Sequence, residues 1–265
     1  MARIDKYRPL VFGLAAIALL VIAISMITRT FSSQEVATTS FAKNHTWLNS
    51  PNDIINSITQ IHRIKEKLVV IDPGHGGDDP GAIYPYDKTN RNNIQVKEKD
   101  LNLDISLKLY DLLKKSGIKV QMTRNDDIYL KPEDRGELAN RLNAALLVSI
   151  HNNYYKASSS CGTMTYFNPS MDPSAYGITG QRAAELVQTE LIKKLGTYDN
   201  GVKELTPRMM YSNTKMPIVL AEVAYISNES DRQNLSTEQF RTQAAQGLYE
   251  GIIKILSEMA ARDSL

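Results

Sequence analysis

From residue 67 onward, short apolar runs alternate with longer segments in which apolar residues recur every three or four positions. The first pattern is typical of β-strands and the second of amphipathic helices. Several runs are apolar at successive positions, as in strands buried on both faces of a parallel sheet. This order predicts an α/β fold, a single twisted, mostly parallel β-sheet flanked by helices on both faces. The predicted strands are 67–72, 118–123, 145–150, 162–168 and 218–222, and the predicted helices are 98–115, 132–143, 179–195 and 237–260.

A longer apolar run precedes this domain. The segment "PLVFGLAAIALLVIAISMI" (9–27) has no charged residue, and about 19 residues rising 1.5 Å each span roughly 28 Å, close to the hydrocarbon thickness of a bilayer. Arg3, Lys6 and Arg8 outnumber Asp5 ahead of it, which favours a cytoplasmic N-terminus. We therefore expect a single-pass protein of the cytoplasmic membrane with its α/β domain on the extracytoplasmic side. A cleaved signal peptide is the alternative, but its apolar region is usually only about 7 to 15 residues long and ends at an A-x-A-like site.

These patterns divide the chain into four parts. We expect residues 1–8 to form a cytoplasmic N-terminus, 9–27 a transmembrane anchor, 28–66 a linker and 67–265 the α/β domain. The linker is rich in Ser, Thr and Asn, and only "DIINSITQIHRI" near its end has weak helical periodicity that would let it pack on the domain.

Composition narrows the possible partners. The net charge is +2, from 31 Lys and Arg against 29 Asp and Glu, which gives no electrostatic basis for binding nucleic acid. The single cysteine, Cys161, cannot form an internal disulfide.

Three polar residues stand at the ends of predicted strands. The stretch "VVIDPGHGGDDPGA" (69–82) places His75 in a glycine-rich turn, His151 follows "LLVSI", and Glu222 ends "IVLAE". Ligands of open α/β sheets bind at the carboxyl ends of the strands, so we expect these side chains to converge. The turn has neither the G-x-G-x-x-G nor the P-loop pattern of a phosphate site.

Glu98 begins a predicted helix and shares an apolar face with Leu101 and Ile105. A buried carboxylate needs a partner, and a metal ion is one. Two His and one Glu are the ligands of a catalytic zinc site with an open position for water, and Glu222 is then the proton carrier for amide hydrolysis. Taken singly, each residue also has an ordinary structural explanation, such as a hydrogen-bonded loop histidine, a helix-dipole contact or a salt bridge.

Four segments in a fixed order resemble the zinc-dependent N-acetylmuramoyl-L-alanine amidases of bacterial cell walls. They are "VVIDPGHGGDDPGA", "EKDLNLDISLKLYDLLKKSGIKVQMTRNDD", "RGELANRLNAALLVSIHNN" and "MPIVLAEVAYISNESD". The resemblance implies that His75, Glu98 and His151 bind Zn²⁺ and that Glu222 is catalytic. It also implies a peptidoglycan substrate, cut at the amide between N-acetylmuramic acid and L-alanine of the stem peptide.

A single anchor before a catalytic domain resembles the CwlD-like sporulation subtype, which acts on spore cortex. No wall-binding repeat is visible in the sequence, so an activating protein partner is expected. The alternative function is a catalytically silent, membrane-anchored wall-binding or scaffold protein, which would have no chemical need for Glu222. Arg124 and Arg135 fit two roles, contact with stem-peptide carboxylates or an ion pair within the protein, and the second is favoured.

Overall fold

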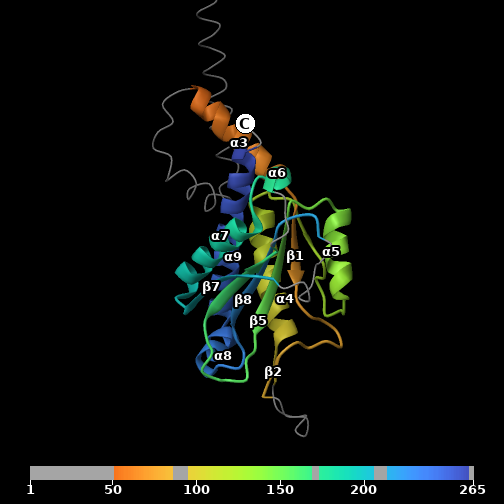
Figure 1. Cartoon of the computed structure of the whole chain (residues 1–265), viewed down its shortest axis with the longest axis vertical. Coiled ribbons are helices and arrows are strands. Elements are labelled where there is room, and N and C mark those ends of the chain that lie inside the picture. Colours follow the sequence, from red (N-terminus) through yellow and green to blue (C-terminus); the bar gives the residue numbers. More distant parts are fainter. Residues whose placement is uncertain (1–50, 86–94, 169–172, 206–213, 263–265) are drawn as a thin grey trace, which may run out of the picture. The chain divides into compact units, whose positions relative to one another are not determined.

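The computed structural model describes residues 51–85, 95–168, 173–205 and 214–262. Within this part of the chain the main sheet has six strands in the order β4-β1-β5-β8-β6-β7. Figure 1 labels β1, β5, β8 and β7 among them. Strands β4, β1, β5 and β8 run parallel to one another, β6 is antiparallel to β8, and β7 is parallel to β6. The predicted mostly parallel sheet is therefore confirmed. The strands are β1 (Val69–Pro73), β4 (Val120–Met122), β5 (Leu146–Asn153), β6 (Thr163–Phe167), β7 (Asp199–Glu204) and β8 (Ile218–Tyr225).

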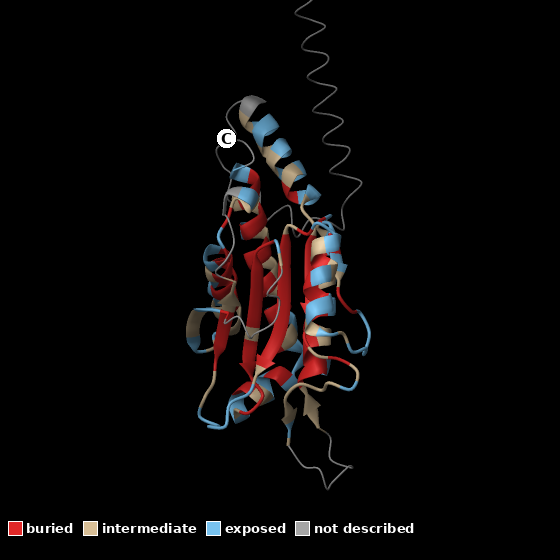
Figure 2. Cartoon of the chain, turned by 45° about the vertical axis from the view of Figure 1, so that its right-hand side comes forward, coloured by how far each residue is buried: buried red, intermediate tan, exposed pale blue. Residues whose placement is uncertain are grey.

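Helices flank this sheet because its central strands β1, β5 and β8 present apolar side chains to both sides. Val69 and Ile71 of β1 belong to the larger core cluster, whereas Val70 between them belongs to a smaller one. The larger cluster is completed by α4 (Glu98–Lys115), α7 (Gly180–Leu195) and α9 (Glu238–Arg262), and the smaller one by α5 (Pro132–Arg141). Figure 2 shows the result, with a buried sheet and helices exposed on their outer surfaces.

Shorter elements complete the described part. They are α3 (Pro51–Glu66), α6 (Pro173–Tyr176), α8 (Glu229–Ser236) and an antiparallel pair, β2 (Ile83–Tyr84) and β3 (Val96–Lys97). Helix α3 lies in the segment predicted to be a linker, and Ile64 near its end is buried in the larger core cluster. The weak periodicity at the end of that segment thus indicated a helix that does pack on the domain.

Two predicted strand ends are wrong. The fifth strand continues to Asn153, so His151 lies within β5 and not after it. Strand β8 continues to Tyr225, so Glu222 lies within it and not at its end. Both extensions have the same cause, because these strands are central in the sheet and neighbouring backbones pair with them beyond the apolar run.

The predicted anchor 9–27 lies outside the described residues. Among the residues that are described, no helix is both long enough and apolar enough to cross a bilayer. The four-part division of the chain stays a prediction.

Candidate metal centre

The turn after β1 brings His75 toward the sheet by an uncommon backbone conformation. His75 has a φ of 61° and Gly76 a φ of 131°, both in the region that residues with a Cβ rarely adopt. A methyl group on Gly74 would lie 2.2 Å from Cε1 of His151, so only glycine fits there. The two imidazole rings consequently meet edge to face, with centroids 4.9 Å apart.

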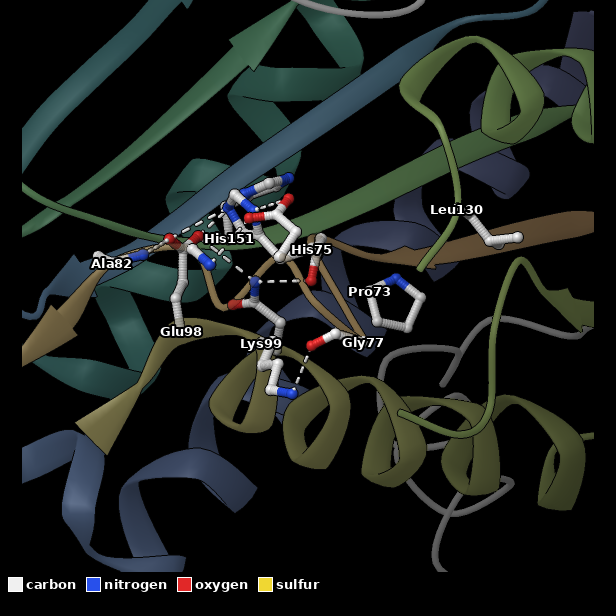
Figure 3. A network of polar contacts seen from close by, with 12 residues as sticks. Pro73, His75, Gly77, Ala82, Glu98, Lys99, Leu130 and His151 are labelled. Atoms are coloured by element: carbon white, nitrogen blue, oxygen red, sulfur yellow. Dashed lines mark hydrogen bonds and ion pairs between the residues drawn. The ribbon is translucent and has the colours of Figure 1, made fainter. Parts of the chain in front are cut away.

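Glu98 lies between the two imidazoles, as predicted from its place on the apolar face of α4. Its Oε1 is 3.0 Å from Nδ1 of His151, and its Oε2 is 3.2 Å from Nε2 of His75 (Figure 3). Backbone N–H groups add to this, since Asn152 donates to Oε1 at 3.1 Å and Ala82 to Oε2 at 2.9 Å. Each of the three side chains offers one ligand atom, and these atoms lie within 4.8 Å of one another.

The charges in this cluster stabilise each other. Burial alone would raise the pKa of Glu98, but hydrogen bonds and positive charge from His151 and His75 outweigh it and hold that pKa well below its usual range. Burial alone would likewise lower the pKa of His75, but Glu98 and then Asp79 raise it to about 9. The cluster therefore centres on a carboxylate that is stabilised by positive charge beside it.

Glu222 joins the cluster from the neighbouring strand. It pairs with His151 in the register of β5 and β8, and burial raises the pKa of its carboxyl to about 7, with His151 lowering it and Glu98 raising it further. A carboxyl group with such a pKa can hold or release a proton near neutral pH. All four predicted site residues are thus brought together by β1, α4, β5 and β8.

Two buried atoms of this cluster have no hydrogen-bond partner among the described residues. They are Nε2 of His151 and Oε2 of Glu222. Buried polar atoms nearly always have partners, so this pair calls for an explanation. Imidazole and carboxylate groups are ligands of divalent transition metals, and a bound cation would balance the charge of Glu98. The residues present therefore fit a metal ion.

Asp79 is a residue of this cluster that the sequence did not lead us to predict. Its Oδ2 is 2.8 Å from Nδ1 of His75, and its Oδ1 accepts a hydrogen bond from the N–H of Gly81 at 3.1 Å. A histidine that binds a metal usually donates its other ring N–H to a carboxylate or carbonyl, which fixes the ring. The available signal was an acidic residue four positions after His75 in the same turn.

Arg135 takes the role that the sequence favoured, an ion pair within the protein, whereas Arg124 binds backbone carbonyls instead. Arg135 forms a buried ion pair with Asp72, at 2.8 Å between Nη1 and Oδ1. The Arg124 guanidinium donates to backbone carbonyls, including that of Pro73 at 2.9 Å. Both side chains are buried, so they are turned inward and do not meet solvent.

Residues 69–254 match the family model described as N-acetylmuramoyl-L-alanine amidase. The chain belongs to this family. The membership confirms the predicted enzyme class, an N-acetylmuramoyl-L-alanine amidase. Among its relatives, the uncharacterized protein YqiI of Bacillus subtilis (strain 168) is 38% identical over 189 residues, which cover 71% of this chain and 84% of YqiI.

Other members of the amidase family align over the same domain. The N-acetylmuramoyl-L-alanine amidase LytC of Bacillus subtilis (strain 168) is 34% identical over 71% of this chain, but the match spans only 35% of LytC. The germination-specific N-acetylmuramoyl-L-alanine amidase of the same strain is 27% identical over 72% of this chain and 81% of its own length. A solved structure of the CwlD amidase from Clostridioides difficile, in complex with the GerS lipoprotein, is 32% identical with a TM-score of 0.61, and covers 72% of this chain and 98% of that one.

Proposed function

We propose that this amidase is a zinc-dependent peptidoglycan hydrolase that cleaves the amide between N-acetylmuramic acid and L-alanine of the stem peptide. The observation that carries the proposal is the gathering of His75, Glu98 and His151, with ligand atoms within 4.8 Å of one another, beside Glu222, whose Oε2 is buried. Family membership supports the substrate class. The donor set of two His and one Glu supports zinc over calcium or magnesium, which prefer oxygen ligands alone.

The residues have separate roles in this proposal. His75, Glu98 and His151 hold the ion, which when bound supplies a Lewis acid and a water of lowered pKa. Glu222 delivers a proton to the departing nitrogen of L-alanine, so that the amine leaves in neutral form. Asp79 keeps the His75 ring oriented through its Nδ1.

Mass spectrometry of the muropeptides released by the full chain tests this function. Incubation of purified peptidoglycan with the zinc-loaded protein should release stem peptides with a new L-alanine amino terminus and leave glycan strands intact. A chelator should stop the release, and added Zn²⁺ should restore it. Release of glycan fragments, or release that is unchanged by a chelator, would contradict the assignment.

We also propose that residues 9–27 anchor the protein in the cytoplasmic membrane, with the catalytic domain on the extracytoplasmic side. The uncharged run and the basic residues ahead of it support this orientation. Protease added to intact protoplasts should then degrade the domain while it leaves only a short membrane-protected fragment. A domain that survives until the protoplasts are lysed would overturn the orientation.

A role in spore cortex processing, with a protein partner, completes the proposal. Support comes from the similarity to a germination-specific amidase and to an amidase whose structure contains a lipoprotein. Cortex from spores of a strain that lacks this chain should retain the stem peptides that the wild type removes. Purification of the tagged chain from sporulating cells should recover an extracytoplasmic partner that raises its turnover. An unchanged cortex would remove the sporulation role and leave the amidase chemistry untouched.

A further inference from the structure

We propose that Arg124 and Arg135 are positioning residues, whose buried guanidinium groups hold His75 and Glu98 in the geometry that binds the metal. The inference rests on the proposed metal site and adds residues that bind the backbone of the segments carrying its ligands. The argument begins with the backbone carbonyls of the turn after β1, which both arginines bind.

Arg135 holds the carbonyl of the ligand residue itself. Its Nη2 donates to the carbonyl of His75 at 2.8 Å, and its Nη1 donates to the carbonyl of Pro73 at 2.7 Å and to Asp72. Asp72 is fixed in turn, because its Oδ1 accepts from Thr123 at 2.6 Å and its Oδ2 from Ser149 at 2.9 Å. The turn is thus tied to α5 and to the body of the sheet.

Arg124 joins two metal-ligand segments to each other. Its Nε donates to the carbonyl of Pro73 at 2.9 Å. Its Nη2 donates both to the carbonyl of Gly74 at 2.9 Å and to the carbonyl of Lys99 at 3.0 Å. Lys99 follows Glu98 in the first turn of α4. One guanidinium group therefore sets the distance between the turn that carries His75 and the helix that carries Glu98.

The turn needs such support because its backbone is strained. A non-glycine residue in the left-handed region, such as His75, is strained and persists only when its surroundings enforce that conformation. The turn also packs directly on Arg124, since a Cβ on Gly76 would lie 2.1 Å from the carbonyl oxygen of Ile128 and 3.0 Å from Nε of Arg124. Between them, the two arginines bind the three successive carbonyls of residues 73 to 75.

Stability alone does not account for this arrangement. The arginines are only 2% and 3% exposed, and burial together with the charge of Arg135 lowers the pKa of Arg124. Buried ionic groups stabilise a fold less well than apolar side chains of similar volume. A planar guanidinium, however, binds several acceptors in fixed directions, which neither lysine nor an apolar side chain does. What the two guanidinium groups contribute is therefore the fixed position of the carbonyls that they bind.

Zinc affinity of the full chain, purified in detergent and stripped of metal, tests the inference. The variants Arg124→Lys and Arg135→Lys keep the charge and lose the multiple hydrogen bonds, and each should raise the Kd for Zn²⁺ by about 10- to 100-fold. The rise in melting temperature on zinc binding should shrink in the same variants. Thr123→Val, which removes one bond to Asp72, is a milder variant that should raise the Kd by a few-fold, on the order of the loss of one hydrogen bond.

Two control variants separate positioning from stability. Arg182→Lys changes an exposed arginine that pairs with Glu258 and should leave the Kd unchanged. Ile252→Val shortens a buried side chain of α9 and should lower the melting temperatures of both the metal-free and the zinc-loaded protein equally, with the same Kd. If the arginine variants and Thr123→Val behave like Ile252→Val, the arginines are merely structural and the inference is overturned. If the unaltered chain binds no zinc, it is the proposed function that fails.

Discussion

The two histidines of the site are held in place by different means. His151 lies in a central strand, and its position follows from the hydrogen-bonded register of β5 with β1 and β8. His75 lies in a turn, with a left-handed backbone that guanidinium groups hold through carbonyls. One ligand is therefore fixed by the same contacts that make the core, and the other by polar contacts that can be removed one at a time. We call His151 and Glu222, in β5 and β8, the strand half of the site, and His75 with the turn after β1 the turn half. Mutations in the two halves should have different effects.

The largest effect is expected at Glu222, in the strand half. Glu222→Gln keeps the shape of the side chain but removes its proton-carrying ability, so turnover should fall by about 10²- to 10⁴-fold. Zinc content should stay the same, because the amide lies beside the ligands and is not one of them. The exposed Glu229→Gln in α8 is the control. Near-normal turnover of Glu222→Gln would show that another group carries the proton.

Filling the space between Gly74 and the His151 ring, by Gly74→Ala, should have the next largest effect. The methyl group of Gly74→Ala would stand 2.2 Å from the His151 ring, and overpacking of this kind costs about 1 to 3 kcal/mol of unfolding free energy. Thermal melts and zinc titrations should both show a loss. Gly196→Ala, whose Cβ would meet nothing within 4 Å, should cost only its left-handed backbone strain and leave zinc affinity intact.

The turn half alone is tested by Asp79→Asn. Loss of the carboxylate that accepts from Nδ1 of His75 should weaken zinc binding by about 10- to 100-fold, measured against a competing chelator. The neighbouring Asp78 is exposed, so Asp78→Asn is a matched control and should bind zinc normally. Equal affinities in the two variants would mean that the His75 ring is oriented without Asp79.

The smallest effect concerns pH. Glu98 and Asp79 raise the pKa of His75 to about 9 in the metal-free protein, above its ordinary value of 6.5. The folded state therefore binds this proton more tightly than the unfolded chain, and the stability it contributes is complete below about pH 6.5 and is lost as the pH rises through about 9. Metal-free protein should melt at progressively lower temperature across this window. Zinc-loaded protein should not follow the same curve, and identical curves would contradict the explanation.

Sequence periodicity predicted most of the fold and all four residues of the central cluster. Helix α4 begins at Glu98 as expected from the apolar spacing of Leu101, Ile105 and Leu109 that follows it. Strand β7 was not predicted, since "DNGVKE" is a polar strand at the sheet edge with no alternation to detect. The support of the turn was missed for another reason. Arg135 lies 60 positions from His75 along the chain, and no local sequence pattern predicts a contact between residues so far apart.

The placement of His151 and Glu222 inside paired strands has a consequence for how members of this fold can diverge. A slip of one residue in either strand would turn His151 or Glu222 to the α4 and α9 side of the sheet, so the pairing that forms the core also holds these two side chains together. The connecting segment after β5, in contrast, lies outside the paired residues, so a change in its length does not by itself shift their register. New substrate preferences would then be acquired at the rim while the chemistry stays unchanged beneath it.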